Sequence, residues 1–350
     1  TVTGMTDYKL SEQLAAKLEH DAMLRERGLI DPVMERLAEH GKRPIQEFID
    51  EYELYLDSKR NTGQHILETL ALIEDVVERC RWETIAHIEG PQLSQDLGRL
   101  IAAGTSARTA NKRRQAVRGF CRWLVREGRL RIDPLAGVAA IRQRDDVRLK
   151  RRALTDEEAA RLIAVAVGGS VIGKLTGVQR AWLYKVALHT GYRASELLSL
   201  TPRSFNLSRR LVVLQAKSSK RRQIDEQPVP RELCDEIAPW LKEHDGDQRL
   251  WLTEHDYTAI MVKADLRAAG IDPEDHGEGC LDFHALRHTY ITRLMRANVP
   301  PKVMQTLARH STIQLTLDRY SHLGLSDPAA AIDSLPSLSG TPAKLRRKGA

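Results

Sequence analysis

Strand-like stretches in this chain cluster in one region, and the spacing of apolar residues on either side of it is typical of amphipathic helices. The candidate strands are 204–207, 211–215 and 222–229, with short turns between them. Helical patterns come before this region and continue after it to about residue 335. Neighbouring strands joined by short turns pair antiparallel. The sequence therefore predicts a mainly α fold with a small antiparallel β-sheet.

A charged stretch with few apolar residues divides the chain into two predicted domains. At 350 residues the chain is long enough for two separate cores. The second domain opens with a capping-box pattern, Thr155-x-x-Glu158, which marks a helix start. In order, the expected parts are an N-terminal helical extension (1–44), a helical domain (45–140), a basic linker (141–152), a larger second domain (153–335) and a basic tail (336–350).

Positive charge is concentrated in residues 105–152, which include the end of the first domain and the linker. The whole chain has a formal net charge of +7, but residues 105–152 alone contain 15 lysines and arginines against four acidic residues. A basic belt on a chain that is otherwise slightly acidic indicates a polyanionic partner, and nucleic acid is the first candidate. A solvated helix face is the alternative explanation.

The longest expected helix, at about 109–127, carries much of this charge. Its apolar positions Val117, Phe120, Cys121 and Leu124 fall on one face. On another face an arginine recurs every four residues, and guanidinium groups at that spacing can follow a phosphate backbone. The predicted DNA-binding residues are Arg114, Arg118, Arg122 and Arg126.

Cysteine spacing and hydropathy exclude several classes of protein. The four cysteines are scattered without a Cys-x-x-Cys pair, which argues against a zinc ribbon and a disulfide framework. We find no signal-peptide pattern and no apolar run near the roughly 18 residues of a membrane span. We therefore expect a cytoplasmic protein without membrane contact. The start at Thr1 suggests a trimmed or processed chain.

Polar side chains in the second half of the chain suit chemistry at a single phosphate. In-line attack on a phosphodiester places negative charge on the non-bridging oxygens, so fixed cations, a nucleophile and a proton donor are needed. The planar fork of arginine grips two phosphate oxygens at once. The candidate catalytic residues, in order, are Arg193, Lys217, His284, Arg287, His310 and Tyr320.

The local context of these residues agrees with such a site. Arg193 comes just after a helix-ending glycine, and Glu196 lies one turn further on, where it can orient a basic neighbour. His284 and Arg287 share a helix face at i, i+3. A zinc-protease helix would need glutamate directly after His284, where Ala285 stands. Neither a phosphate-binding glycine–lysine motif nor an acidic magnesium cluster is present, so no metal or other cofactor is predicted.

Taken together, these segments resemble the tyrosine recombinases of the phage-integrase type. Residues 190–197 resemble the first arginine box, and 284–289 match the His-x-x-Arg-His-Thr box. Residues 307–310 and 317–322 resemble the terminal histidine and nucleophile boxes. The resemblance spans about 45–335, and these boxes in this order are highly specific.

The resemblance implies a role for each candidate residue. Tyr320 would attack a scissile phosphate, forming a 3′-phosphotyrosine and releasing a 5′ hydroxyl. Arg193 and Arg287 would clamp the phosphate, with His284 and His310 as acid/base or hydrogen-bonding groups.

The family also uses a lysine in a β-hairpin turn, which would protonate the leaving oxygen. Lys217 fits that place, and Lys220 is its rival in the same turn.

The resemblance further implies an assembly on DNA. The two domains would form a clamp around double-stranded DNA, with the linker crossing it, and a homotetramer would assemble during synapsis. Residues 326–335 would dock on a neighbouring subunit or close their own domain. The N-terminal helices look like the end of an arm-binding module, and we expect an integrase of a phage or other mobile element.

The sequence departs from the family's pattern at two places. Arg309 stands where glycine is commonest, and Tyr192 stands where leucine is usual. Neither position is catalytic, so the departures concern the packing around them. Tyr290 occupies a place where a core aromatic is usual, and we expect it to pack.

Other functions remain open. The same chemistry serves recombinases that resolve chromosome or plasmid dimers, and DNA relaxases of the type IB topoisomerase kind. A non-catalytic DNA-binding regulator could keep the fold, although six intact chemical positions argue against it. A zinc hydrolase is the remaining alternative.

Overall fold

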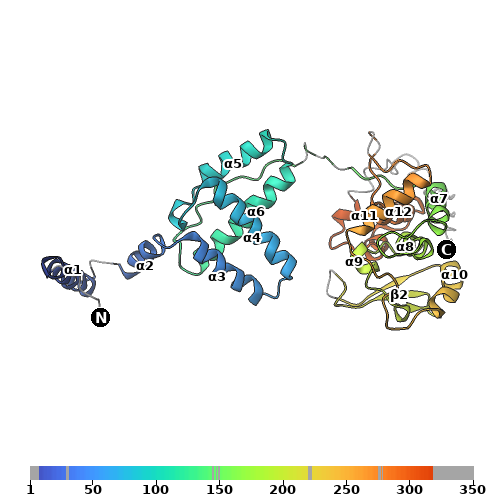
Figure 1. Cartoon of the computed structure of the whole chain (residues 1–350), viewed down its shortest axis with the longest axis horizontal. Helices are drawn as coiled ribbons and strands as arrows, with labels where there is room; N and C mark the ends of the chain where they lie inside the picture. The colour runs from blue at the N-terminus through green and yellow to red at the C-terminus, as the bar shows by residue number, and fades with distance from the viewer. Residues whose placement is uncertain are drawn as a thin grey trace, which may run out of the picture. The chain divides into compact units, whose positions relative to one another are not determined.

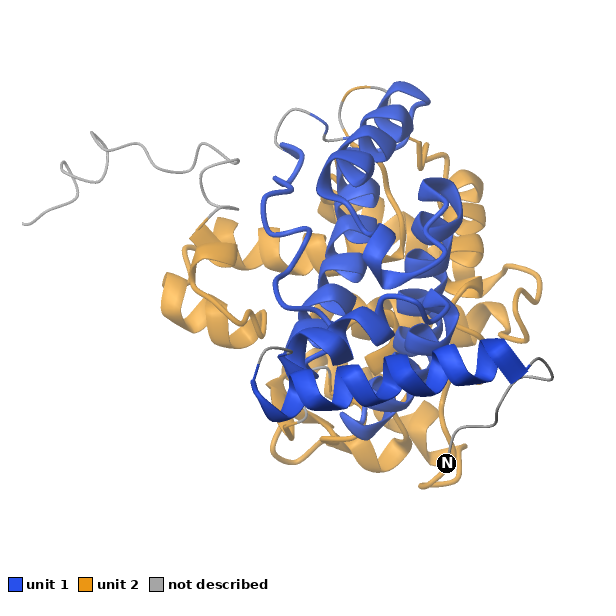
Figure 2. Cartoon of the chain, turned by 90° about the vertical axis from the view of Figure 1, so that its left-hand side faces the viewer, with its two compact units in different colours: residues 1–148 blue, residues 149–350 orange. Residues whose placement is uncertain are grey.

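The computed structural model describes residues 8–28, 31–143, 146, 148, 150–219, 223–274, 277 and 279–317. The chain divides into two compact units, residues 1–148 and 149–350, drawn in different colours in Figure 2. Helices make up most of both units, and a small antiparallel sheet belongs to the second (Figure 1). The predicted fold class is confirmed. Every helix within the described ranges is too short or too polar to cross a bilayer.

The first unit is helical. Its elements are α1 (Tyr8–Glu26), α2 (Pro32–His40), α3 (Ile45–Ser58), α4 (Gly63–Cys80), the 3-10 helix η1 (Ile85–His87), α5 (Gly90–Ala102) and α6 (Ala107–Arg126). Neither α1 nor α2 contains a buried residue, so the core of this unit comes from the elements after them. The hydroxyls of Thr62 and Ser106 cap α4 and α6 by accepting backbone N–H groups of the first turn.

Helix α6 is the central element of that core. Val117, Phe120, Cys121 and Leu124 are fully buried, as their periodicity predicted, and α6 packs against α3, α4 and α5. The rings of Tyr52, Phe120 and Trp123 meet in edge-to-face, tilted and stacked pairs at the α3–α6 contact. Burial of this face fixes which side of α6 remains toward solvent.

The second unit consists of helices and one small sheet. Its elements are α7 (Asp156–Val167), α8 (Gly177–Thr190), α9 (Ala194–Leu197), η2 (Pro202–Ser204), β1 (Phe205–Asn206), β2 (Leu211–Leu214), β3 (Asp225–Pro228), α10 (Arg231–Lys242), α11 (Tyr257–Ala268), α12 (Phe283–Arg296) and α13 (Pro301–Leu307).

The sheet has strand order β1-β2-β3 and is antiparallel throughout. Phe205 pairs with Val212, and Leu214 pairs with Asp225, so the strands coincide with the predicted stretches. Val212 and Leu214 alternate with half-buried neighbours and enter the core. The loop that follows β2 carries Lys217.

Helix α8 lies among the other helices of this unit and packs against α7 and α12 (Figure 1). The predicted capping box at Thr155 and Glu158 is present at the start of α7. Helix α8 ends at Gly191, whose φ of +63° is left-handed. A Cβ there would lie 2.3 Å from the Tyr290 ring, so glycine is required for two reasons. This close packing sets the position of the chain leading into Arg193.

A buried ion pair joins α8 to α11. Arg180 is fully buried and forms two hydrogen bonds with the carboxylate of Asp265, at 2.8 and 3.0 Å. The Tyr184 hydroxyl donates to the same carboxylate at 2.8 Å. Burial raises the pKa of Tyr184, so its hydroxyl stays protonated and remains a donor. The carboxylate therefore satisfies two buried groups at once.

We predict that Asp265→Ala destabilises the second unit by about 3 kcal/mol, because it leaves the Arg180 cation buried without its counter-ion. Hydrogen–deuterium exchange of peptides from α8 and α11 measures this opening free energy directly. The matched control is Asp247→Ala, which breaks an exposed pair with Arg203 and should leave exchange unchanged. Equal exchange rates in the two variants would contradict a stabilising role for the buried pair.

Candidate active site

Arg193 lies where the chain leaves α8 and enters the short helix α9. It is the N-cap residue of α9, and its backbone N–H donates to the Glu196 carboxylate at 2.8 Å. Its guanidinium donates to the other oxygen of Glu196 at 3.1 Å. The Arg193 side chain remains about one-third exposed. The arginine is therefore held from behind by Glu196 while part of it stays accessible.

Glu196 is a buried carboxylate shared by two arginines. It is 1% exposed, and it accepts a 2.6 Å bond from Arg309 in addition to those from Arg193. Burial disfavours its charged form, but the opposite charge of Arg309 and the Arg193 backbone N–H outweigh this and keep its pKa below the usual value. The expectation that Glu196 orients a basic neighbour agrees with this geometry.

Arg287 is a buried cation that donates to two backbone carbonyls, those of Gly191 and Ala308. Gly191 is the C-cap of α8 and Ala308 the C-cap of α13, where carbonyl groups lack partners within the helix. The negative ends of these helices compensate part of the desolvation of Arg287. The three helix segments are thereby tied to one guanidinium.

Positive charge is crowded at this place. Burial lowers the pKa of Arg287 to about 10, and repulsion from Arg193 and Arg309 contributes further. Arg287 is still protonated at pH 7, so three guanidinium groups are balanced locally by the Glu196 carboxylate and, more distantly, by Asp225 at 3.5 Å from Arg309. An arrangement of this kind favours binding of an anion.

His284 stands one turn before Arg287 on α12. It is exposed to solvent, yet the protein around its imidazole and the guanidinium groups of Arg151 and Arg287 lower its pKa to about 4. The imidazole is therefore neutral at pH 7 in the free protein, with one donor and one acceptor nitrogen.

The position of His284 is fixed by the N-terminus of α12. The N-cap residue Asp282 accepts the backbone N–H of Ala285 at 3.0 Å. Its carboxylate also pairs with Arg151, at 2.6 to 2.9 Å. Arg151 belongs to the segment predicted as a linker, and its role beside His284 was not predicted.

His310 lies shortly after the end of α13, beyond its C-cap Ala308. Its Nδ1 lies 2.9 Å from the Thr316 hydroxyl, and its backbone N–H donates to Gln305. The carbonyl of Ala308, two residues earlier, is one of the acceptors of Arg287. The His310 segment is thus attached to the arginine cluster through the backbone.

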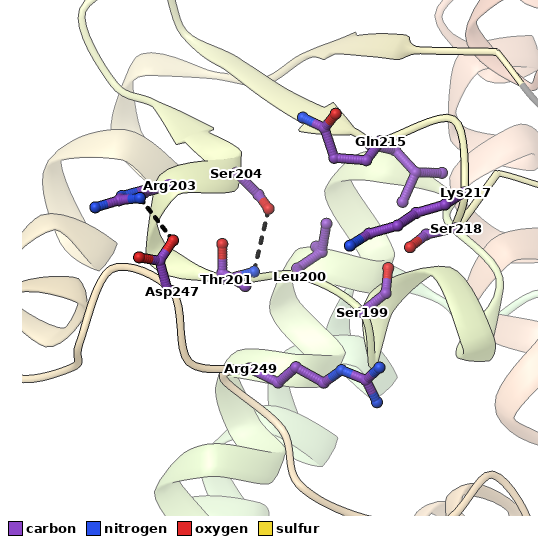
Figure 3. A pocket seen from close by; sticks show the side chains of 11 residues that line it. Ser199, Leu200, Thr201, Arg203, Ser204, Gln215, Lys217, Ser218, Asp247 and Arg249 are labelled. Carbon is purple, nitrogen blue, oxygen red and sulfur yellow. Dashed lines mark hydrogen bonds and ion pairs between the residues drawn. The ribbon is translucent and has the colours of Figure 1, made fainter.

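Lys217 lies in the exposed turn after β2 and lines a pocket of about 340 Å³. Figure 3 shows its side chain extending into this pocket between Gln215 and Ser199, with Arg249 below. The pocket wall includes the hydroxyls of several serines and a threonine. The rival lysine, Lys220, and the predicted nucleophile, Tyr320, lie outside the described residues.

The structure thus brings Arg193, His284 and Arg287 into electrostatic contact and ties the His310 segment to them. Sequence reasoning missed the contribution of Arg309, although its place before His310 drew notice as a departure from the family pattern. As expected, Tyr290 packs in the core, 8% exposed, and its hydroxyl accepts from Gln227.

The predicted arginine stripe on α6 is not uniformly exposed. Arg122 and Arg126 face solvent, whereas Arg114 and Arg118 are half-buried. Arg114 donates to the Val138 carbonyl at 2.7 Å, and Arg126 stacks over Tyr55 at 4.6 Å. The role of the arginine stripe in DNA binding stays a prediction.

The other exposed basic residues of α6 are Arg108 and Lys112. At about 100° per residue they share a face with Gln115, Arg122 and Arg126. The sequence prediction did not name Arg108 and Lys112, although helical spacing places both of them on this face.

Sequence comparison identifies two family signatures in the chain. Residues 152–325 match the Phage integrase family, and residues 49–128 match the phage integrase N-terminal SAM-like domain. Among curated relatives, the tyrosine recombinase XerC of Azotobacter vinelandii is 27% identical over 299 residues, covering 83% of this chain and 95% of the relative. XerC of Mycobacterium bovis is also 27% identical and covers 81% of this chain and 96% of its own length.

Solved structures share the fold. The Tn1549 transposon integrase in complex with transposon right end DNA superposes with a TM-score of 0.62 at 18% identity, covering 83% of this chain and 99% of that one. A lambda integrase tetramer bound to a Holliday junction also gives 0.62, at 17% identity, with 87% and 88% covered. With both signatures present in order, this chain belongs to the phage integrase family and is a tyrosine recombinase.

Proposed function

We propose that this recombinase cleaves and rejoins strands of double-stranded DNA, with Tyr320 as the nucleophile and Arg193 and Arg287 as the clamp on the scissile phosphate. The main support is the crowding of guanidinium groups around the buried Arg287: burial, together with repulsion from Arg193 and Arg309, lowers the pKa of Arg287 to about 10. A bound phosphate would relieve this repulsion. Arg287 is preorganised by two backbone carbonyls, so little reorganisation is needed when charge develops on the phosphate.

The proposed reaction is a reversible exchange of phosphodiester bonds. The Tyr320 oxygen forms a bond to phosphorus, and the bond from phosphorus to the 5′ oxygen breaks. Lys217 donates a proton to that leaving oxygen. The 5′ hydroxyl of a partner strand then attacks the phosphotyrosine and releases the tyrosine, so the number of phosphodiester bonds is conserved.

The two histidines have supporting roles in this proposal. A pKa of about 4 leaves the His284 imidazole neutral in the free protein, so it can accept the tyrosine proton or donate a hydrogen bond to a phosphate oxygen. His310 donates to the phosphate from the ring nitrogen that does not face Thr316.

DNA binding is shared between the units. The helical domain (45–140) would contact the duplex through the exposed face of α6, and the catalytic domain (153–335) would contact the scissile phosphate. We infer that Arg108, Lys112, Arg122 and Arg126 contribute more than the half-buried Arg114 and Arg118. A homotetramer on DNA would supply the four active sites that exchange between two duplexes requires.

We propose an integrase of a phage or other mobile element that works in the cytoplasm. The helical extension formed by α1 and α2 precedes the SAM-like match and has no buried residue, which suits the end of an arm-binding module. The XerC relatives favour a second candidate, a dimer-resolving recombinase of the same chemistry. Attachment-site repeats beside the gene would support the first; their absence, with exchange at a chromosomal or plasmid dimer site, would support the second.

Tyr320→Phe should abolish formation of a covalent protein–DNA adduct, because phenylalanine has no attacking oxygen. The substrate is a DNA site selected from randomised duplexes by the wild-type protein and nicked near the scissile phosphate, so that cleavage traps the adduct. Denaturing gel electrophoresis measures the adduct, and a gel shift should show unchanged DNA affinity. A covalent adduct in this variant would refute the nucleophile assignment.

Lys217→Ala should slow cleavage by about 10²–10⁴-fold, because the departing oxygen loses its proton donor. Replacing the bridging 5′ oxygen by sulfur should restore the rate, since a thiolate leaves without protonation. Lys220→Ala is the matched control in the same turn and should cleave both substrates at the wild-type rate. The opposite pattern would transfer the role to Lys220.

Lys112→Gln should lower DNA affinity similarly for all sequences and reduce the slope of log affinity against log salt concentration by about one, through loss of one phosphate contact. Arg114→Gln, whose guanidinium already bonds to the Val138 carbonyl, should leave that slope unchanged. Fluorescence anisotropy with labelled duplexes at several salt concentrations measures both. A larger slope change for Arg114→Gln would place the DNA on the other face of α6.

A further inference from the structure

Arg309 and Tyr192 form a buried pair beside the arginine cluster. The Arg309 guanidinium carbon lies 4.2 Å from the centre of the Tyr192 ring, and the two residues are 4% and 1% exposed. The Tyr192 hydroxyl donates to the Val212 carbonyl of β2 at 2.8 Å, which fixes the ring on the sheet. A cation over an aromatic face in a desolvated place is attracted strongly.

The same guanidinium reaches two carboxylates. One nitrogen of Arg309 donates to Glu196 at 2.6 Å, and another lies 3.5 Å from Asp225 at the start of β3. Asp225 also accepts the Ser219 hydroxyl at 2.7 Å, in the turn that carries Lys217. Arg309 therefore contacts the carboxylate behind Arg193 and the base of the Lys217 turn.

The backbone at this pair holds Arg287. The carbonyl of Gly191 immediately precedes Tyr192, and the carbonyl of Ala308 immediately precedes Arg309. Both carbonyls accept from the Arg287 guanidinium. Contact between the Tyr192 and Arg309 side chains thus keeps the two acceptors at the separation that one guanidinium spans.

Two features make arginine energetically unfavourable at position 309: its backbone conformation and the burial of its charge. Its φ is +51°, a left-handed backbone conformation in which glycine is less strained. Its charge is buried near Arg193 and Arg287, two other cations. Tyr192 and Arg309 are also the two departures from the family's pattern named above. Their direct contact gives the two departures a common explanation.

We propose that Tyr192 and Arg309 are a positioning pair that orients both arginines of the phosphate clamp. Arg309 acts on Arg193 through Glu196. The pair acts on Arg287 through the carbonyls of Gly191 and Ala308. This inference rests on the proposed function, in which Arg193 and Arg287 bind the scissile phosphate.

The test compares Arg309→Gly, Tyr192→Leu and the double variant in single-turnover cleavage of the nicked, selected DNA site. Arg309→Gly should cleave about 10²-fold more slowly, because a clamp displaced by an ångström loses about that much rate. Its DNA affinity should stay within about threefold of wild type, since phosphate contacts elsewhere are intact. The double variant should be no slower than the slower single variant, because both substitutions break the same contact.

Arg210→Gly is the matched control. Arg210 also has a left-handed φ, +55°, but it lies exposed in the turn before β2. This variant measures the effect of removing left-handed backbone strain alone, and it should cleave at the wild-type rate. If Arg309→Gly fails to fold in circular dichroism, Arg309→Lys replaces it, because an ammonium keeps the charge but cannot reproduce the fork that joins Glu196 and Asp225.

The outcomes separate the two proposals. A wild-type cleavage rate in the folded Arg309 variant overturns the positioning pair, as does a loss of affinity that equals the loss of rate. Additive losses in the double variant also overturn it. If the wild-type protein forms no adduct through Tyr320, the proposed function itself fails.

Discussion

The buried guanidinium of Arg287 is the interaction on which the rest of the site depends. It belongs to α12 and donates to the C-terminal carbonyls of α8 and α13, so three helices meet at one planar group. A buried cation is costly unless its hydrogen bonds are satisfied. The ends of two helices supply the acceptors that their own backbones leave unpaired. The position of the site and the packing of these helices therefore have the same physical cause.

Much of the local structure could be predicted from the sequence because the signals are local. The capping box at Thr155, the glycine that ends α8 and the buried face of α6 depend on residues within a few turns. The strands were equally recognisable from short apolar stretches between turn residues. In these cases propensity, spacing and tertiary packing favour the same conformation.

Residue spacing in the sequence could not predict which catalytic side chains lie close together in the fold. Arg193 and Arg287 are far apart in the sequence, and their proximity follows from the packing of α8 against α12. Only the resemblance to a family linked them. The contacts of the Arg309 guanidinium could not be predicted for the same reason, because Tyr192 and Glu196 belong to a distant segment of the sequence. On α6, residues four apart rotate by about 40° per step, so a four-residue repeat winds around the helix and carries Arg114 and Arg118 toward the core.

The ion pair between Arg151 and Asp282 has a mechanical consequence. Arg151 pairs through its backbone with Cys280 and through its side chain with the N-cap of α12. The start of the second unit is thus attached through Arg151 to Asp282, two residues before His284. Tension along the connecting chain would be delivered at the start of the helix that carries both His284 and Arg287.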